Sequence, residues 1–358
     1  MLGLTNNQSQ QRLRLNPPAT SLSTCSPTRQ HLKGYGMKNL KKIALGTLLL
    51  ASVCVASAQS LTVATGEAKK GFSKLFANIN DVCGTTVPLK ELNTNGGLEN
   101  VGELANKNAV LGLVPVDIYQ TMEKTDDAIG RLKAVMSLNS NLLHVVVSSA
   151  GYQYQEGRVC DGKELFGKCT GDWKPVVKTK VITTMEDLKG RKVAAVGSAQ
   201  VLARSYFNKK LGYGMDVRDV DPDAKAFELL KKGEVDAVLT MAAYPAGGVS
   251  ALKQDSGLTL VDFNLPASGV YKVTSKNYKN LGVYGRKFLA VPNLLMARPV
   301  DPNGETGQQI TRLKACISSN LKKMQDETGF EPSWSDVTTT AVPDEVPTWT
   351  GVLPKTKK

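Results

Sequence analysis

The stretch Thr94-Asn95-Gly96-Gly97-Leu98-Glu99-Asn100 lies at the centre of the predicted fold. An extended run precedes it at residues 86–92, and a helical run follows at residues 98–106. Two adjacent glycines at such a junction allow the backbone to turn tightly and to approach a ligand closely. The helix after the turn presents its free N–H groups and the positive end of its dipole there. The stretch is therefore either a plain turn or a site for a small anion or polar group.

Strands and helices are expected to alternate on both sides of this turn. Apolar, β-branched runs predict strands at residues 61–65, 109–114, 134–138 and 142–148, and Asn139-Ser140-Asn141 is expected to separate the last two. Phe72, Leu75, Phe76 and Ile79 recur at helical spacing before the turn. This alternation predicts a mostly parallel sheet with helices on both faces.

A second set of elements follows after an interruption. Residues 151–180 are rich in Gly, Lys and Tyr, which predicts a surface hairpin or loop insertion. Strands are then expected at residues 192–196, 216–220 and 235–241, with helices between them. A long amphipathic helix is predicted at residues 305–327, and the Pro- and Thr-rich end of the chain is expected to wrap the surface. Two domains of about 150 residues each are expected.

The first 58 residues have the pattern of a leader with a signal peptide. A basic segment begins at Met37, an apolar run of 13 residues spans 43–55, and Ala56-Ser57-Ala58 is a cleavage site that leaves Gln59 first. We expect Met37 to be the true start, cleavage after Ala58 and a periplasmic location. The apolar run is too short to span a bilayer.

The charge of the chain is concentrated in this leader. Residues 1–58 hold seven of the 45 Lys and Arg and none of the 32 Asp and Glu, so the remaining chain carries +6 rather than +13. This excess is too small to indicate a nucleic-acid partner, and none is expected.

Four cysteines remain after the leader, and an even number in an exported chain predicts disulfides. Cys160 and Cys169 flank a short, turn-rich segment and are predicted to pair. Cys83 and Cys316 lie in the first and last long helices and pair only if the two ends of the chain meet in one domain. The alternative is four free or metal-binding thiols, although no C-x-x-C spacing indicates a metal.

No catalytic pattern is present after the leader. His144 is the one histidine there, and its apolar strand predicts a core residue. The nucleotide-binding, zinc-protease and serine-hydrolase motifs are absent. We therefore expect no catalytic residues, no metal and no cofactor.

Small polar residues instead occupy the junctions that follow the predicted strands. Ligands bind at the carboxyl ends of strands in open parallel sheets, and two domains with such loops would enclose a cleft. Ser198 is a candidate N-cap that binds an anion, Tyr244 a cover for the ligand, and Glu99 and Asp117 are candidate partners of an ammonium or hydroxyl group. Each also has a structural alternative in capping, packing or solvation. The predicted ligand-binding residues are Thr65, Gly66, Asn95, Gly96, Gly97, Glu99, Asn100, Asp117, Ser198 and Tyr244.

Several segments, in this order, resemble the TAXI-type substrate-binding receptors of tripartite (TRAP) transporters. They are LTVATG (61–66), TNGGLENVGELANKNAVLGLVPVD (94–117), RLKAVMSLNSNLLHVVV (131–147), MEDLKGRKVAAVGS (185–198), LLKKGEVDAVLTMAAYPAGGVSAL (229–252) and LPASGVY (265–271). The 151–180 insertion has no counterpart in that family. The resemblance implies an α/β fold of the two-lobed, type II periplasmic binding protein class, each lobe with a mostly parallel sheet flanked by helices.

The resemblance also implies an organisation and a function. Lobe 1 is expected to comprise residues 59–149 plus 269–358, and lobe 2 residues 150–268. The implied function is an exported receptor, not an enzyme, that delivers a small organic acid or amino acid to inner-membrane transporter subunits. A ligand-sensing input protein, a same-fold biosynthetic enzyme and a binding protein with a structural role remain alternatives. A bulky residue at Gly97 is expected to abolish binding with little loss of fold.

Overall fold

The computed structural model describes residues 59–352, which belong to one compact unit. The predictions of a leader, its cleavage site and a periplasmic location rest on residues 1–58 and lie outside the described residues. Among residues 59–352, no helix is both long enough and apolar enough to cross a membrane.

One ten-stranded sheet runs through the unit in the order β10-β9-β11-β4-β14-β3-β1-β2, with β12 paired to β4 and β13 to β14. Both ends of the sheet are parallel, whereas β4 and β14 are antiparallel to their neighbours. The strands are β1 (Leu61–Ala64), β2 (Leu89–Leu92), β3 (Leu111–Pro115), β4 (Lys133–Ser148), β9 (Lys192–Val196), β10 (Asp216–Asp219), β11 (Ala237–Ala243), β12 (Leu258–Leu260), β13 (Lys272–Tyr278) and β14 (Val283–Ala297).

The predicted break at Asn139-Ser140-Asn141 is wrong, because β4 continues through it. Asn139 and Asn141 are buried, and Asn293 of the neighbouring β14 donates its Nδ2 to both of their Oδ1 atoms at 3.0 Å. A polar triplet normally indicates a loop because buried amides need partners. Here a strand from a distant part of the chain supplies that partner.

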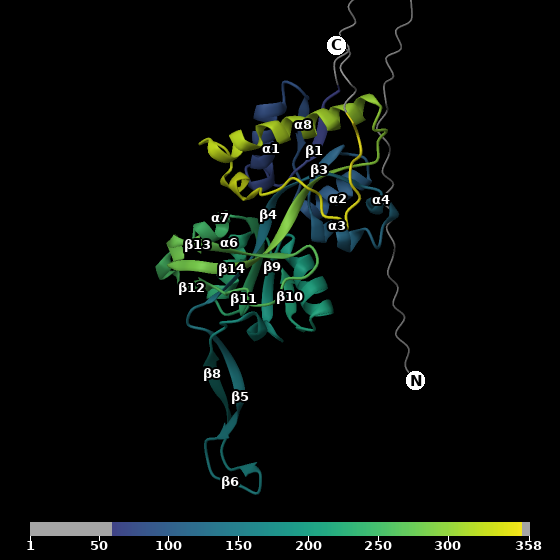
Figure 1. The fold of residues 1–358 in the computed structure, drawn as a ribbon. Coiled ribbons are helices and arrows are strands. Elements are labelled where there is room, and N and C mark those ends of the chain that lie inside the picture. The colour runs from purple at the N-terminus through teal and green to yellow at the C-terminus, as the bar shows by residue number, and fades with distance from the viewer. Residues whose placement is uncertain (1–58, 353–358) are drawn as a thin grey trace, which may run out of the picture. The chain divides into compact units, whose positions relative to one another are not determined.

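Four hydrophobic clusters divide the molecule into two lobes. Two clusters combine residues from 61–138 with residues from 270–349, and the other two combine residues between 142 and 290. Figure 1 shows the same division, with both ends of the described chain in one lobe. The α/β, two-lobed fold class is therefore confirmed. The sheet is continuous rather than separate in each lobe, because β4 and β14 are long enough to serve both cores.

The exact lobe boundaries, 59–149 plus 269–358 and 150–268, stay a prediction because β4 and β14 carry residues of both cores. Lobe 1 is the part that contains β1 to β3, and lobe 2 is the part that contains β9 to β12. The stretch from residue 246 to 298, for which no strand was predicted, supplies β12, β13 and β14.

Helices cover both faces of the sheet. In α1, Leu75, Phe76 and Ile79 form the buried stripe that its spacing predicts. Lobe 1 has α1 (Gly71–Cys83), α2 (Gly97–Ala105), α3 (Val116–Met122), α4 (Asp127–Gly130) and α8 (Glu305–Asp326); lobe 2 has α5 (Ala199–Val201), continued by a π-helix (Leu202–Lys210), α6 (Asp223–Lys231) and α7 (Gly247–Ser250). Short 3-10 turns occupy Met185–Leu188, Gln254–Ser256, Lys279–Leu281 and Pro332–Asp336.

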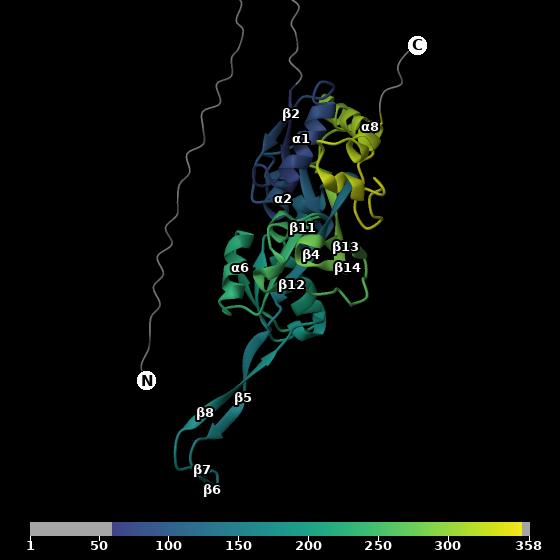
Figure 2. The ribbon, with the colours of Figure 1, turned by 90° about the vertical axis from the view of Figure 1, so that its left-hand side faces the viewer.

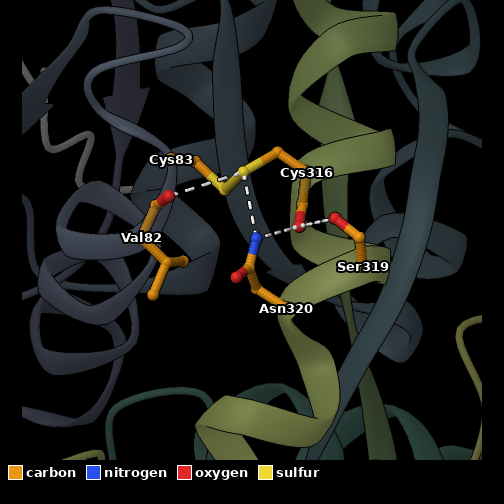
Figure 3. The surroundings of a disulfide bond; sticks show 5 residues. All are labelled: Val82, Cys83, Cys316, Ser319 and Asn320. Atoms are coloured by element: carbon orange, nitrogen blue, oxygen red, sulfur yellow. Dashed lines mark hydrogen bonds between the residues drawn. A yellow bond between two sulfur atoms is a disulfide. The ribbon is translucent and has the colours of Figure 1, made fainter.

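Both predicted disulfides are present in the structure. Cys83 at the end of α1 is bonded to Cys316 in α8, with 5.9 Å between their Cα atoms. Figure 3 shows this bond, beside which Asn320 Nδ2 donates to the Cys316 carbonyl at 3.0 Å. The two ends of the described chain therefore meet in lobe 1.

The end of the chain does more than wrap the surface of lobe 1. Trp334 is fully buried in the core that contains α1 and α8. Trp349 is also buried, and its Nε1 donates to Thr311 Oγ1 at 3.1 Å. Apolar anchors in a Pro- and Thr-rich segment thus make it part of the fold.

The insertion at residues 151–180 is a hairpin arm. It consists of β5 (Tyr152–Cys160) and β8 (Trp173–Lys180), with a small second hairpin of β6 (Glu164–Leu165) and β7 (Lys168–Cys169) at its end. Cys160 and Cys169 are bonded there, with 5.4 Å between their Cα atoms. Figures 1 and 2 show that the arm projects from lobe 2 away from lobe 1.

Candidate functional site

A pocket of about 280 Å³ lies where a turn of lobe 1 faces a turn of lobe 2. Both turns follow the carboxyl ends of parallel strands, where loops gather at one edge of a sheet. Four of its eight residues, Asn95, Gly97, Glu99 and Ser198, were predicted as ligand-binding. The other four, Leu98, Gly197, Gln200 and Asp221, were not in that prediction. The lining residues are Asn95, Gly97, Leu98 and Glu99 from lobe 1, and Gly197, Ser198, Gln200 and Asp221 from lobe 2.

The lobe 1 wall is the first turn of α2. Gly96 precedes the helix with φ 110°, a conformation that favours glycine, and its N–H donates to Thr94 Oγ1 at 3.0 Å. The N–H groups of Gly97, Leu98 and Glu99 have no carbonyl partner within the helix because they begin it. The wall therefore combines free donors with the positive end of a helix dipole.

Glu99 adds a carboxylate to the same wall. Its Oε2 accepts hydrogen bonds from both the backbone N and the side-chain Nδ2 of Asn95, each at 2.8 Å. These two bonds hold the carboxylate at the pocket. Donors for an anion and an acceptor for a cation therefore lie on one turn.

The lobe 2 wall pairs a turn with a second carboxylate. Gly197 has φ 55°, and its N–H donates to Asp221 Oδ1 at 3.1 Å. Burial raises the pKa of Asp221, the Gly197 hydrogen bond lowers it, and the nearby carboxylates of Glu67 and Asp219 raise it further. A positively charged group in the pocket would relieve this crowding of acidic side chains.

Ser198 takes the predicted N-cap position of α5, but its hydroxyl makes no capping hydrogen bond. Its backbone is helical (φ −66°, ψ −14°), whereas a capping serine usually has an extended backbone. The hydroxyl is consequently not engaged by the helix. Ser198 lines the pocket together with Gln200.

Thr65, Gly66 and Asn100 support the lobe 1 turn from behind. Asn100 is fully buried: its Nδ2 donates to the carbonyls of Thr65 and Leu113, and its Oδ1 accepts from Thr94 Oγ1 at 2.6 Å. The Thr65 hydroxyl donates to Glu91 at 2.8 Å, and the Gly66 carbonyl accepts from the Thr94 N–H. These polar groups are used inside the fold, and none of the three residues lines the pocket.

Gly97 is required by packing rather than by backbone angle. A Cβ atom added there would overlap the ring of Pro115, the last residue of β3. The expectation that a bulky residue at Gly97 leaves the fold nearly intact is therefore wrong. The glycine allows α2 to lie directly against the end of β3.

Asp117 lies outside this pocket, in the first turn of α3. Its side chain is buried, and its Oδ1 accepts from the Ile118 N–H at 2.9 Å. Burial raises the pKa of Asp117 to about 6, against the lowering effect of that hydrogen bond. Burial and the Asp117 charge both raise the pKa of Tyr271, which packs against the lobe 1 core.

Tyr244 also lies outside the pocket. Its hydroxyl donates to the Asn277 carbonyl at 2.7 Å, and the Lys276 Nζ lies 4.9 Å from the centre of its ring. The tyrosine packs against the core of lobe 2. In this arrangement its hydroxyl is already occupied.

His144 is a core residue, as predicted. It is fully buried, and its Nε2 lies 2.7 Å from the Tyr278 hydroxyl. Burial lowers the pKa of His144 to about 4, so the ring is neutral at pH 7. Residues 59–352 contain no group of three or more His, Cys, Asp and Glu that could hold a metal ion.

Comparison with protein families finds no match, and comparison with curated proteins finds no relative. Solved structures that the comparison matches to this chain include the GluR0 ligand-binding core in complex with L-glutamate, at 14% identity and a TM-score of 0.43, over 74% of this chain and 95% of that one. An amino acid ABC transporter substrate-binding protein from Streptococcus pneumoniae, bound to L-arginine, has 11% identity and a TM-score of 0.45, over 77% of this chain and 95% of its own. At these levels of similarity, neither structure assigns a ligand or a partner to this chain.

Proposed function

We propose that the protein is a solute-binding receptor that captures a small organic acid or amino acid between its lobes and delivers it to a membrane transporter. The observation that carries this proposal is the pocket itself. Gly97 and Glu99 of lobe 1 and Gly197 and Ser198 of lobe 2 line the same space, whereas Gly96, also predicted as ligand-binding, is not part of the lining. A ligand held there would touch both lobes at once.

The chemistry of the walls favours an amino acid over a plain organic acid. The first-turn N–H groups of α2 and the Ser198 hydroxyl are suited to a carboxylate. Glu99 and Asp221 are suited to an ammonium group, and they would repel a second carboxylate. A small zwitterion satisfies both sets, so we propose an amino acid as the principal ligand.

The mechanism we propose is closure of the two lobes on the ligand. β4 and β14 are the long strands that pass between the two cores, and their bending would open or close the pocket. A ligand that contacts both walls only in the closed form shifts the population toward that form. Binding without chemical turnover is all that this requires of the chain.

We further propose, from the sequence resemblance, that the transporter is of the tripartite type and that the receptor is exported to the periplasm. Interaction with the transporter's membrane subunits would separate this proposal from a sensory role. The test is reconstitution of uptake with those subunits. Absence of ligand-dependent association with them would contradict a transport role.

The ligand assignment is tested by native mass spectrometry of the protein purified from its own host, followed by a thermal-shift screen of amino acids and organic acids. A ligand that binds the folded state raises the melting temperature by mass action. Glu99→Gln and Asp221→Asn should each weaken amino-acid binding roughly tenfold or more, because each removes one of the two carboxylates proposed to bind the ammonium group of the ligand. Glu103→Gln, on the same helix but outside the pocket lining, is the matched control. Unchanged affinity in both pocket variants would refute the site.

A further inference from the structure

The hairpin arm supplies none of the residues that line the pocket, yet it is the most prominent feature of lobe 2 (Figures 1 and 2). Its longer strand has nine residues, which extend roughly 30 Å. The base is tied to lobe 2 by the ion pair of Lys180 with Asp187 at 3.0 Å and by Arg191, which lies 4.6 Å from the centre of the Tyr152 ring. The end of the arm is thus held well away from the pocket.

The shaft of the arm is protected against pairing with other strands. A two-stranded ribbon exposes unpaired N–H and C=O groups along both edges, which attracts a further strand. Here Pro175 interrupts β8, and a bulge between Gln155 and Gly157 interrupts β5. Ion pairs of Lys174 with Asp161 and of Lys178 with Glu156 add charge along the shaft. These features disfavour strand exchange with a second copy of the chain.

The tip, by contrast, exposes large apolar side chains. Leu165 is 57% exposed and Phe166 is fully exposed, at the turn between β6 and β7. Phe166 and Gly167 both have positive φ, 51° and 76°, which forms a tight turn with the phenyl ring outside it. The Cys160–Cys169 bond closes the loop behind this turn. A convex apolar end on a solvated shaft indicates a contact surface.

The residues around the tip have the distribution found at a lipid interface. Trp173, which pairs with Cys160 in the register, is 41% exposed behind the turn. Lys163 and Lys168 flank the apolar residues, and neither forms an ion pair with any residue between 59 and 352, whereas the shaft lysines do. Tryptophan and lysine are enriched at head-group depth. Glu164 and Asp172 also lie around the tip, and both are exposed, so apolar insertion rather than net charge must dominate.

We propose that the arm tip inserts into the surface of a lipid bilayer. Leu165 and Phe166 enter the boundary of the acyl chains, Trp173 lies among the head groups, and Lys163 and Lys168 contact lipid phosphates. A bilayer accepts a convex apolar end without a preformed pocket, which a protein partner would have to supply. Two apolar side chains give a weak and reversible attachment, with the lobes held off the membrane by the length of the arm.

The test is co-sedimentation of the exported chain with protein-free vesicles of phosphatidylcholine, alone or mixed with phosphatidylglycerol. Wild-type protein should bind both kinds of vesicle to a similar extent, because apolar insertion dominates, and the tryptophan emission should shift to the blue as Trp173 enters the head groups. The double variant Leu165→Ser/Phe166→Ser should lose binding roughly tenfold or more, because it removes the apolar area that enters the bilayer. Val177→Ser, which removes a 53% exposed apolar side chain from the shaft, is the matched control and should bind as wild type does.

Three results would overturn the proposal. One is absence of binding to both kinds of vesicle. Another is full binding by the Leu165→Ser/Phe166→Ser variant. The third is binding only to vesicles that contain a membrane protein, which would identify a protein partner for the tip. The affinity for the pocket ligand should be unchanged in the double variant. The vesicle experiment therefore tests the arm tip independently of the proposed ligand site.

Discussion

The two turns that face each other across the pocket are supported in different ways. In lobe 1, the Thr94 and Asn100 side chains and the Pro115 ring hold the turn from three sides. In lobe 2, the side-chain hydrogen bond to the turn is the one from the Gly197 N–H to Asp221, and the Ser198 hydroxyl caps nothing. One wall is therefore built into the core, while the other is held mainly by its own backbone.

This difference suggests a division of labour between the walls. A wall that is already ordered loses little conformational freedom when a ligand binds, so it favours affinity. A wall with fewer internal contacts can adjust when the lobes close. Substitutions in the lobe 1 turn should consequently lower the stability of the protein. Substitutions in the lobe 2 turn should mainly lower its affinity for the ligand.

The largest expected effect tests the packing of the lobe 1 wall. Gly97→Val should lower the free energy of unfolding by about 3 kcal/mol, because the new side chain would overlap Pro115. Urea denaturation measures this loss. Gly102→Ala is the control: it lies on the same helix with no atom within 4 Å of an added Cβ, and it should stabilise the protein by about 0.5 kcal/mol. Equal stability of Gly97→Val and wild type would disprove the packing role.

A second experiment compares the two turns directly. Asn100→Ala should cost about 2 kcal/mol of stability, because three buried hydrogen bonds lose a partner. Ser198→Ala should change stability by less than about 0.5 kcal/mol, since no capping bond is lost, while it weakens ligand binding. Chemical denaturation and calorimetric titration of both variants provide the comparison. Similar stability losses in the two would show that the walls are equally supported.

The third prediction concerns Asp117 and pH. Its pKa is raised from 3.8 to about 6, so the folded state holds the proton more tightly than the unfolded state does. This contribution to stability is fully present below pH 3.8 and is lost as the pH rises through about 6. Asp117→Asn replaces the carboxyl by a side chain that cannot ionise, so the variant does not lose this stability at high pH. It should be more stable than wild type by about 1 to 2 kcal/mol at neutral pH, which is part of the roughly 3 kcal/mol that corresponds to the pKa shift.

Denaturation of wild type and Asp117→Asn across this range measures the effect. Only the difference between the two proteins is informative, since His144 acts in the opposite direction. Its pKa is lowered to about 4, so the stability it contributes is lost as the pH falls below its ordinary value of 6.5. A difference between wild type and variant that does not change with pH would contradict the raised pKa of Asp117.

Much of the fold was predictable because its signals are local. The predicted strand at residues 192–196 and the predicted start of the long helix at residue 305 match the structure. Both follow from the spacing of apolar residues and from the turn residues at the ends of the segments, which are local properties. β14 was missed, and β4 was split in two. The split of β4 has a physical cause: the Oδ1 atoms of Asn139 and Asn141 accept hydrogen bonds from Asn293, more than 150 positions away in the chain.

The candidate site was predictable only in part, because small polar residues at strand ends look alike in sequence. Glu99 and Ser198 line the pocket, while Asn100 and Thr65 have turned inward to hold the backbone. Asp221, in a Pro-flanked turn before α6, was not among the predicted pocket residues. Its hydrogen bond to Gly197 joins two loops that are distant in sequence, and no local signal reports it.

Local sequence was enough to predict the alternation of elements, the glycine turn at residues 96–97, the core position of His144 and the cysteines available for pairing. Each depends on residue type, spacing or backbone freedom, which are properties of a short segment. Folding of the whole chain was needed to establish which polar side chains face the pocket, that Gly97 is fixed by Pro115, and that one sheet serves both lobes. These depend on partners brought together by folding, since a polar group turns toward whichever partner satisfies it.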